Sequence, residues 1–192
     1  MESSFWHKCW ERNTLGFHQS DVHPLLSQYF NKLCLPSDKH IFVPLCGKTL
    51  DMAYLAKYMQ VTGNELSEIA CRDFFLDNSI EYQKQTLGDF THFSCPQLLL
   101  LQGDFFKLNA DNIESIDWIY DRAALIALPI AMQREYVNHL KSVDVNSLFS
   151  GFNIECIAKN EIKGKQFAQR TLEVDYLIEK LYIISTNNSE YS

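Results

Sequence analysis

Three positions in this chain have the residue types and spacing of a site for an adenosine-like ligand. Gly47 lies in a turn after an apolar run, where a residue without a Cβ lets the backbone approach a ligand closely. Glu65 follows 18 residues later, the spacing at which a dinucleotide fold places an acid on a ribose hydroxyl. Asp104, next to a pair of phenylalanines, is placed to bind the amine of an adenine held between aromatic rings. We therefore expect an adenosine-like molecule at one edge of a sheet.

Other interpretations of the same positions remain open. A single glycine, without a complete G-x-G-x-x-G, also fits an ordinary strand-to-helix junction, and Asp104 after a glycine is also typical of a turn. The string G-K-T at 47–49 matches the end of a phosphate-binding loop, but Phe42 stands where the first glycine of that motif belongs, and Pro44 removes a backbone donor. A nucleotide phosphotransferase is therefore disfavoured.

A pair of charges, Asp121 and Arg122, follows the apolar run at 118–120. Ligands in open α/β sheets bind beside the carboxyl ends of the strands, so charges that emerge there are better site candidates than surface charges elsewhere. The alternative is that the two side chains pair with each other and only tie down a loop. The sequence alone does not decide between a ligand site and a loop contact.

Aromatic residues precede the first strand. Trp6 and Trp10 are four residues apart and share a face if the segment is helical, and Phe17 and His18 follow. One interpretation is a hydrophobic plug, the usual role of aromatics at helical spacing. The other is a lid over a ligand, because aromatic faces attract a cation such as a sulfonium.

The elements that would position these residues alternate between strand and helix. We expect parallel strands at 41–43, 60–63, 98–101 and 118–120. We expect helices at 24–35, 50–58, 67–78 and from Pro129 onward. Two further apolar segments, 154–158 and 180–184, are joined by a polar link and are expected to finish the sheet as an antiparallel pair. This alternation predicts a doubly wound α/β fold.

Composition narrows the class of ligand and compartment. With 192 residues the chain fits one domain, and its net charge of −7 without a basic cluster argues against a nucleic-acid surface. The six cysteines form no C-x-x-C pair, which indicates a reducing cytoplasm, and the His and Cys spacing does not predict a metal site. No apolar run has the length of a membrane span. We expect a cytoplasmic monomer that binds a small molecule.

Five motifs together resemble the thiopurine S-methyltransferases, especially the bacterial form. They are W-x-x-x-W at 6–10 with Phe17-His18, F-V-P-L-C-G-K-T-x-D-M at 42–52, G-x-E-L-S-E at 63–68, G-D-F-F at 103–106 and Y-D-R-A-A-L-I-A-L-P at 120–129. They occur in the order of the family and span about three quarters of the chain. The resemblance implies a Rossmann-like class I methyltransferase with a mostly parallel, seven-stranded sheet and an antiparallel C-terminal strand. The implied domain covers residues 1–192, with 1–39 as a helical lid segment.

The resemblance also implies a cofactor, S-adenosyl-L-methionine, with S-adenosyl-L-homocysteine as its product. The methyl acceptor would be the sulfur of an aromatic or heterocyclic thiol such as a thiopurine, and some bacterial members are linked to selenium or tellurium compounds. The implied cofactor residues are Trp6, Trp10 and Phe17 at the methionine end, Leu45 and Gly47 behind them, Glu65 at the ribose, Asp104 and Phe105 at the adenine, and Arg122. Phe17 and Arg122 would face the acceptor, and Arg122, oriented by Asp121, would stabilise the thiolate.

The chain departs from the family pattern after Lys141. The family has a further strand and a G-P-P-[FY]-S-V loop there, whereas this chain passes at once to S-V-D-V-N-S-L-F at 142–149. A strand and a functional loop need about two dozen residues, so the family pattern has an apparent gap near 141–142, and the loss of a central strand would leave a gap in the sheet. Asn64, before Glu65, is a smaller departure from an apolar position. The alternative function is a non-catalytic S-adenosylmethionine-binding protein that has lost its substrate loop.

Overall fold

The structure is a computed structural model that describes residues 3–16, 18–143, 152–163, 166–167, 170–171 and 176–186. Side-chain surroundings are described for residues 4–140 except Phe17.

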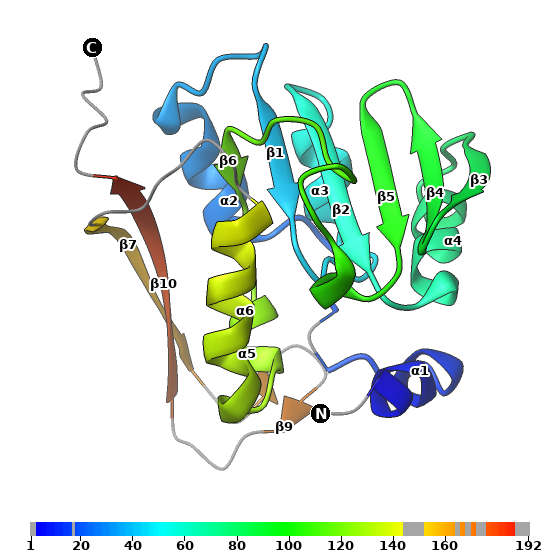
Figure 1. Ribbon diagram of the computed structural model, residues 1–192. Helices are drawn as coiled ribbons and strands as arrows, with labels where there is room; N and C mark the ends of the chain where they lie inside the picture. The colour runs from blue at the N-terminus through cyan, green and yellow to red at the C-terminus, as the bar shows by residue number, and fades with distance from the viewer. Residues whose placement is uncertain are drawn as a thin grey trace.

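A six-stranded sheet with the order β3-β4-β5-β2-β1-β6 forms the centre of the molecule (Figure 1). Its strands are β1 (His40–Val43), β2 (Gln60–Glu65), β3 (Gln83–Leu87), β4 (Phe90–Cys95), β5 (Leu98–Gln102) and β6 (Trp118–Ile119). Pairing is parallel among β5, β2, β1 and β6, whereas β3 and β4 add an antiparallel hairpin at one edge. The predicted α/β fold with a mostly parallel centre is confirmed.

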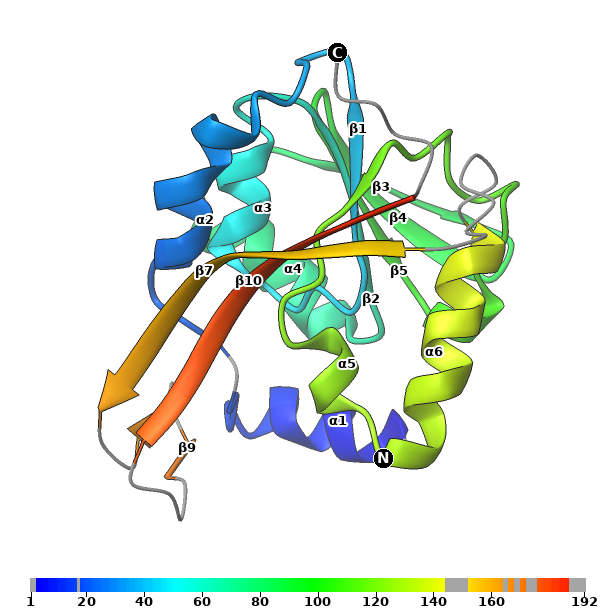
Figure 2. The ribbon, with the colours of Figure 1, turned by 90° about the vertical axis from the view of Figure 1, so that its left-hand side faces the viewer.

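Helices cover both faces of this sheet. They are α1 (Ser3–Glu11), α2 (Pro24–Tyr29), α3 (Leu50–Leu55), α4 (Glu68–Asp77), α5 (Ala124–Ala127) and α6 (Ile130–Val143), with 3-10 turns η1 (Phe30–Leu33) and η2 (Phe105–Lys107). Figures 1 and 2 show α2, α3 and α4 on one face and α6 on the other. Helix α1 lies below the carboxyl ends of the parallel strands (Figure 1). The four predicted parallel strands and the helices around them are therefore present.

Alternation along β1 divides the core into two layers. Ile41 and Val43 pack into the cluster on the side of α3 and α4, whereas Phe42, fully buried, packs with Tyr136 of α6. Residues on both sides of a parallel strand are covered, which explains why β1 has a continuous apolar run. Met132, Tyr136 and Leu140 form the inner face of α6, because all three belong to or pack against this second cluster.

Two expectations about the sheet differ from the structure. The described residues form six strands in the main sheet instead of seven. The C-terminal strands β7 (Phe152–Lys163) and β10 (Tyr176–Thr186) do pair antiparallel, but they form a sheet of their own, as do β8 (Gln166–Phe167) and β9 (Arg170–Thr171). In the described part of the chain, β6 pairs only with β1. Among the described residues, the main sheet thus ends at β6.

The hairpin of β3 and β4 was missed because its first strand is polar. All five residues of β3 are exposed, so apolar periodicity does not mark it. Gly88 between the strands has a φ of +58°, which provides the turn. Pairing with β4, which is itself paired with β5, makes this segment a strand.

We expect Gly63→Ala to destabilise the protein by about 2–3 kcal/mol through overpacking. A Cβ at Gly63 would lie 2.5 Å from Leu100 Cδ2 and 2.8 Å from both Cys46 Sγ and Met52 Sδ. Urea unfolding measures the loss. Gly88→Ala is the control, since a Cβ there meets nothing within 4 Å and costs only the left-handed backbone strain of about 1 kcal/mol. Equal losses in the two variants would contradict the overpacking.

Candidate active site

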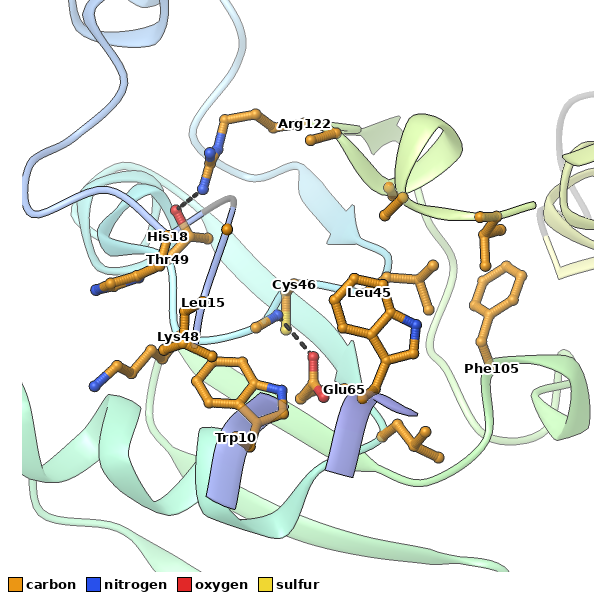
Figure 3. Close-up of a pocket in the computed structure, with 18 of the residues that line it drawn as sticks. Trp10, Leu15, His18, Leu45, Cys46, Lys48, Thr49, Glu65, Phe105 and Arg122 are labelled. Atoms are coloured by element: carbon orange, nitrogen blue, oxygen red, sulfur yellow. Dashed lines mark hydrogen bonds between the residues drawn. The ribbon is translucent and has the colours of Figure 1, made fainter. Parts of the chain in front are cut away.

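A pocket of about 500 Å³ opens at the carboxyl ends of the parallel strands. Its walls come from α1 and the segment after it, the turn between β1 and α3, the ends of β2 and β5, and α5 with the start of α6. The lining residues are Trp6, Trp10, Leu15, Gly16, His18, Leu45, Cys46, Gly47, Lys48, Thr49, Glu65, Leu66, Asp104, Phe105, Phe106, Arg122, Ala123, Ala124, Ala127, Leu128 and Met132. Figure 3 shows Glu65 between Trp10 and Leu45, with Arg122 and Phe105 on different sides. Most of the site predicted from the sequence is therefore brought together in one cavity.

The turn after β1 is shaped by two left-handed residues. Leu45 has a φ of +47° and Gly47 a φ of +58°, a conformation that glycine adopts without strain. A Cβ at Gly47 would lie 3.4 Å from the ring of Trp10, so helix α1 rests directly on this turn. Thr49 caps α3, accepting a hydrogen bond from Asp51 N at 3.3 Å. The turn therefore presents backbone and a small residue to the pocket, as predicted.

Glu65, at the end of β2, is the buried acid of the pocket. Its Oε2 accepts a hydrogen bond from Gly47 N at 2.9 Å, and its Oε1 accepts one from Ser67 N at 2.7 Å. Burial raises the pKa of Glu65 to about 7, and the backbone donors oppose this shift. Each carboxylate oxygen has a second lone pair, so both can also accept a hydrogen bond from a ligand hydroxyl.

Asp104 fits both interpretations that the sequence left open. Its Oδ1 accepts a hydrogen bond from Phe106 N at 3.0 Å and caps the 3-10 turn η2, as expected for an aspartate after a glycine. It also lines the pocket together with Phe105, which is buried and in contact with the second core cluster. The structural role and a ligand role are therefore compatible at this position.

Arg122 does not pair with its neighbour Asp121. Its Nε lies 2.8 Å from Asp51 Oδ2, and its Nη2 donates to Thr49 Oγ1 at 2.9 Å. Both partners come from the start of α3, where an acid also stabilises the helix dipole. The guanidinium is thus held beside the pocket by a buried carboxylate that the sequence analysis gave no role.

Asp121 has a different place from the one expected. Its Oδ2 accepts a hydrogen bond from the hydroxyl of Tyr136 at 2.8 Å, and its Oδ1 accepts one from Ala124 N at 3.1 Å. It is not among the residues that line the pocket. Burial raises the pKa of Asp121, and the hydrogen bonds from Tyr136 and the α5 backbone oppose this. The expectation that Asp121 orients Arg122 is therefore wrong, because the carboxylate is used to tie α5 to α6.

Helix α1 supplies the aromatic wall of the pocket. Trp6 and Trp10 both line the cavity, which agrees with the lid interpretation, while Phe17 lies outside the described residues. His18 lines the pocket on the side of Arg122 and Thr49 (Figure 3). The pKa of His18 is lowered by burial and by the charges of Lys48 and Arg122.

The sequence analysis missed several lining residues of α5, α6 and their junction. Ala123, with a φ of +64°, turns the chain away from Arg122, and Ala127, Leu128 and Met132 complete an apolar wall. They belong to apolar stretches that carry no chemical signal. The only signal for them in the sequence was their position after the carboxyl end of the predicted strand at 118–120.

In the described ranges, no group of three or more His, Cys, Asp or Glu side chains is arranged to hold a metal ion. No helix in the part of the chain that the structure describes is both long and apolar enough to cross a membrane.

Residues 1–149 match the family model for thiopurine S-methyltransferase. The chain belongs to the thiopurine S-methyltransferase family. Curated members include one from Shewanella baltica, 46% identical over 144 residues, and one from Shewanella oneidensis, 46% identical over 141 residues. The matches cover 74% and 73% of this chain but 66% and 65% of those relatives. The chain thus spans slightly less than two thirds of their length in these matches.

Solved structures confirm the fold of the family. A SAM-dependent methyltransferase from Anabaena variabilis has a TM-score of 0.54 at 14% identity and covers 80% of this chain and 61% of its own. Magnesium protoporphyrin IX methyltransferase from Synechocystis, solved with bound S-adenosylhomocysteine, has a TM-score of 0.52 at 13% identity. The match covers 86% of this chain and 74% of that protein. The architecture is therefore the Rossmann-like fold of S-adenosylmethionine-dependent methyltransferases.

We expect the stability of the protein to decrease between pH 4.5 and about 7 because Glu65 is buried. A carboxyl with a pKa raised from 4.5 to about 7 stabilises the folded state while it is protonated, and this contribution is lost as pH rises through the folded pKa. Relative to Glu65→Gln, the unfolding free energy of the unmodified protein should fall by about 2–3 kcal/mol over this range. Chemical unfolding at several pH values measures it. The exposed Glu114→Gln is the control, and a parallel pH dependence of the unmodified protein and Glu65→Gln would contradict the assignment.

Proposed function

We propose that this protein transfers the methyl group of S-adenosylmethionine to the sulfur of aromatic or heterocyclic thiols, thiopurines among them. The observation that carries the proposal is the pocket in which a buried acid at the end of β2 lies beneath the tryptophans of α1, in a chain of this family. Membership of the family supports the reaction class, and the pocket supports the ligand. Selenium or tellurium compounds are further candidate acceptors, on the ground of the family resemblance alone.

The residues at the pocket fit the cofactor. Glu65 presents both carboxylate oxygens where hydroxyls of a ribose can donate, and Gly47 keeps the neighbouring wall free of a side chain. Phe105 offers an apolar surface for an adenine, with Asp104 at its edge. Trp6 and Trp10 would face the methionine end, where their rings attract a sulfonium.

The acceptor end of the pocket is assigned to Arg122. When bound, S-adenosylmethionine supplies an electrophilic methyl group on its sulfonium. Since transfer to a thiolate cancels a positive and a negative charge, walls that exclude water favour the transition state over separated, hydrated ions. Arg122 holds a thiolate in line with the methyl group and stabilises its charge. A strong nucleophile of this kind needs no further activation once it is deprotonated.

We also propose that the protein works as a cytoplasmic monomer and binds no nucleic acid. Five cysteines in the described part of the chain are free, and Cys46 and Cys71 among them are buried, as is usual in a reducing compartment. The net charge of −7 disfavours binding to a polyanion.

The test is a calorimetric titration of the purified protein with S-adenosylhomocysteine, followed by a methylation assay on thiophenol and a thiopurine. Binding together with formation of the methyl thioether is the expected result. Binding without turnover would favour the alternative of a cofactor-binding protein that has lost its substrate loop. The absence of binding would contradict the assignment of Gly47, Glu65 and Asp104 to a cofactor site.

Glu65 and Arg122 should separate cofactor binding from turnover. We expect Glu65→Ala to weaken the affinity for S-adenosylhomocysteine about tenfold or more, since it removes a charged acceptor of ribose hydroxyls. Arg122→Ala should lower kcat about 10- to 100-fold, because it removes charge stabilisation at the acceptor, and should change cofactor affinity by less than about threefold. Calorimetry and steady-state kinetics measure the two effects.

The control for this pair is Arg72→Ala. Arg72 is an exposed arginine of α4, paired with Asp73 and absent from the pocket lining, so both parameters should stay as they are. Equal losses of cofactor affinity in Glu65→Ala and Arg122→Ala would refute this division of roles.

A further inference from the structure

Asp51 is a buried carboxylate that joins three segments of the chain. It is 1% exposed. Its Oδ1 accepts a hydrogen bond from His23 N at 2.7 Å. Its Oδ2 accepts one from the Tyr120 hydroxyl at 3.1 Å and lies 2.8 Å from Arg122 Nε. A carboxylate removed from water is stable only with such partners, so its position determines theirs as well.

Asp51 itself does not line the pocket, whereas two of the residues that it contacts do. Thr49 and Arg122 are lining residues, and Thr49 Oγ1 accepts hydrogen bonds from Asp51 N and from Arg122 Nη2. The start of α3 therefore holds the guanidinium at two points, through Nε and through Nη2. An ion-pair contact at Nε and a hydrogen bond at Nη2 restrain the orientation of the planar group as well as its position.

We infer that Asp51 is a positioning residue for methyl transfer, which acts by holding Arg122 in the orientation that the acceptor thiolate requires. This inference rests on the proposed function. Asp51 does not line the pocket, so its effect on the reaction itself passes through the guanidinium. Without the carboxylate, Arg122 keeps its charge but loses the contact at Nε, and a displacement of about 1 Å at such a group is enough to lower the rate strongly.

The carboxylate of Asp51 also positions the segment between α1 and α2. His23 caps α2 and follows the stretch that contains the lining residue His18, and its backbone N–H is fixed by Asp51 Oδ1. An effect of Asp51 on stability is therefore expected in addition to its effect on Arg122. The test has to separate the two.

A double-mutant cycle with Asp51→Asn and Arg122→Ala makes this separation, because residues that act as a unit give non-additive effects. We expect Asp51→Asn to lower kcat about tenfold when Arg122 is present and by less than about twofold in the Arg122→Ala protein. Affinity for S-adenosylhomocysteine should stay within about threefold throughout. The same loss in both backgrounds would show a merely structural role and overturn the inference, as would a kcat of Asp51→Asn within about twofold of the unmodified protein.

A second measurement does not depend on activity. In a ¹⁵N-correlated NMR spectrum, the Nε–H signal of Arg122, assigned by its absence from Arg122→Ala, should be sharp in the unmodified protein and broadened or shifted in Asp51→Asn. Asp89→Asn is the matched control, since it makes the same change at an exposed ion pair with Lys107. An unchanged signal in Asp51→Asn overturns the inference. If the unmodified protein methylates no thiol, the proposed function fails, and this signal alone decides whether Asp51 holds Arg122.

Discussion

A carboxylate that is taken out of water must be surrounded by donors, and two such groups organise the carboxyl edge of this sheet. Glu65 draws in the backbone N–H groups of Gly47 and Ser67, and so joins the turn after β1 to the start of α4. Asp51 joins the start of α2 to the end of β6. Backbone N–H groups of the loops at this edge, those of Gly47, Ser67 and His23, are satisfied by these two carboxylates. Their arrangement depends largely on these two acids, and so does the pocket that the loops enclose.

The position of the pocket follows from the architecture. Parallel strands covered on both faces end at the same edge, and the loops that follow them converge there. Residues that follow β1, β2, β5 and β6 line the cavity, and so do Trp6 and Trp10 of α1. Helix α1 lies below the carboxyl ends of these strands (Figure 1). The sheet thus provides a rigid base, and residues of different chemistry are brought together by connections that are free to vary.

Local patterns predicted the parts of the structure that depend on local interactions. The strands β1 and β5 were recognisable because a strand that is buried on both faces is a continuous apolar run. Glu65 was recognisable because its distance from Gly47 along the chain reflects one strand-helix-strand unit. The partner of Arg122 was not, since Asp121 and Asp51 are equally plausible from charge alone and only the three-dimensional fold brings Asp51 to Nε. The polar strand β3 was missed for the same reason, because its pairing with β4 is not visible in its own residues.

Helix α1 closes the pocket with only nine residues. A helix of this length is not stable by itself in water, so it keeps its form only while it is docked. The aromatic wall that Trp6 and Trp10 give the pocket therefore exists only while α1 is docked, because an undocked α1 loses its helical form. Loss of this wall and local unfolding of the first segment are then one event, and the stability of the docked helix sets how long the wall persists.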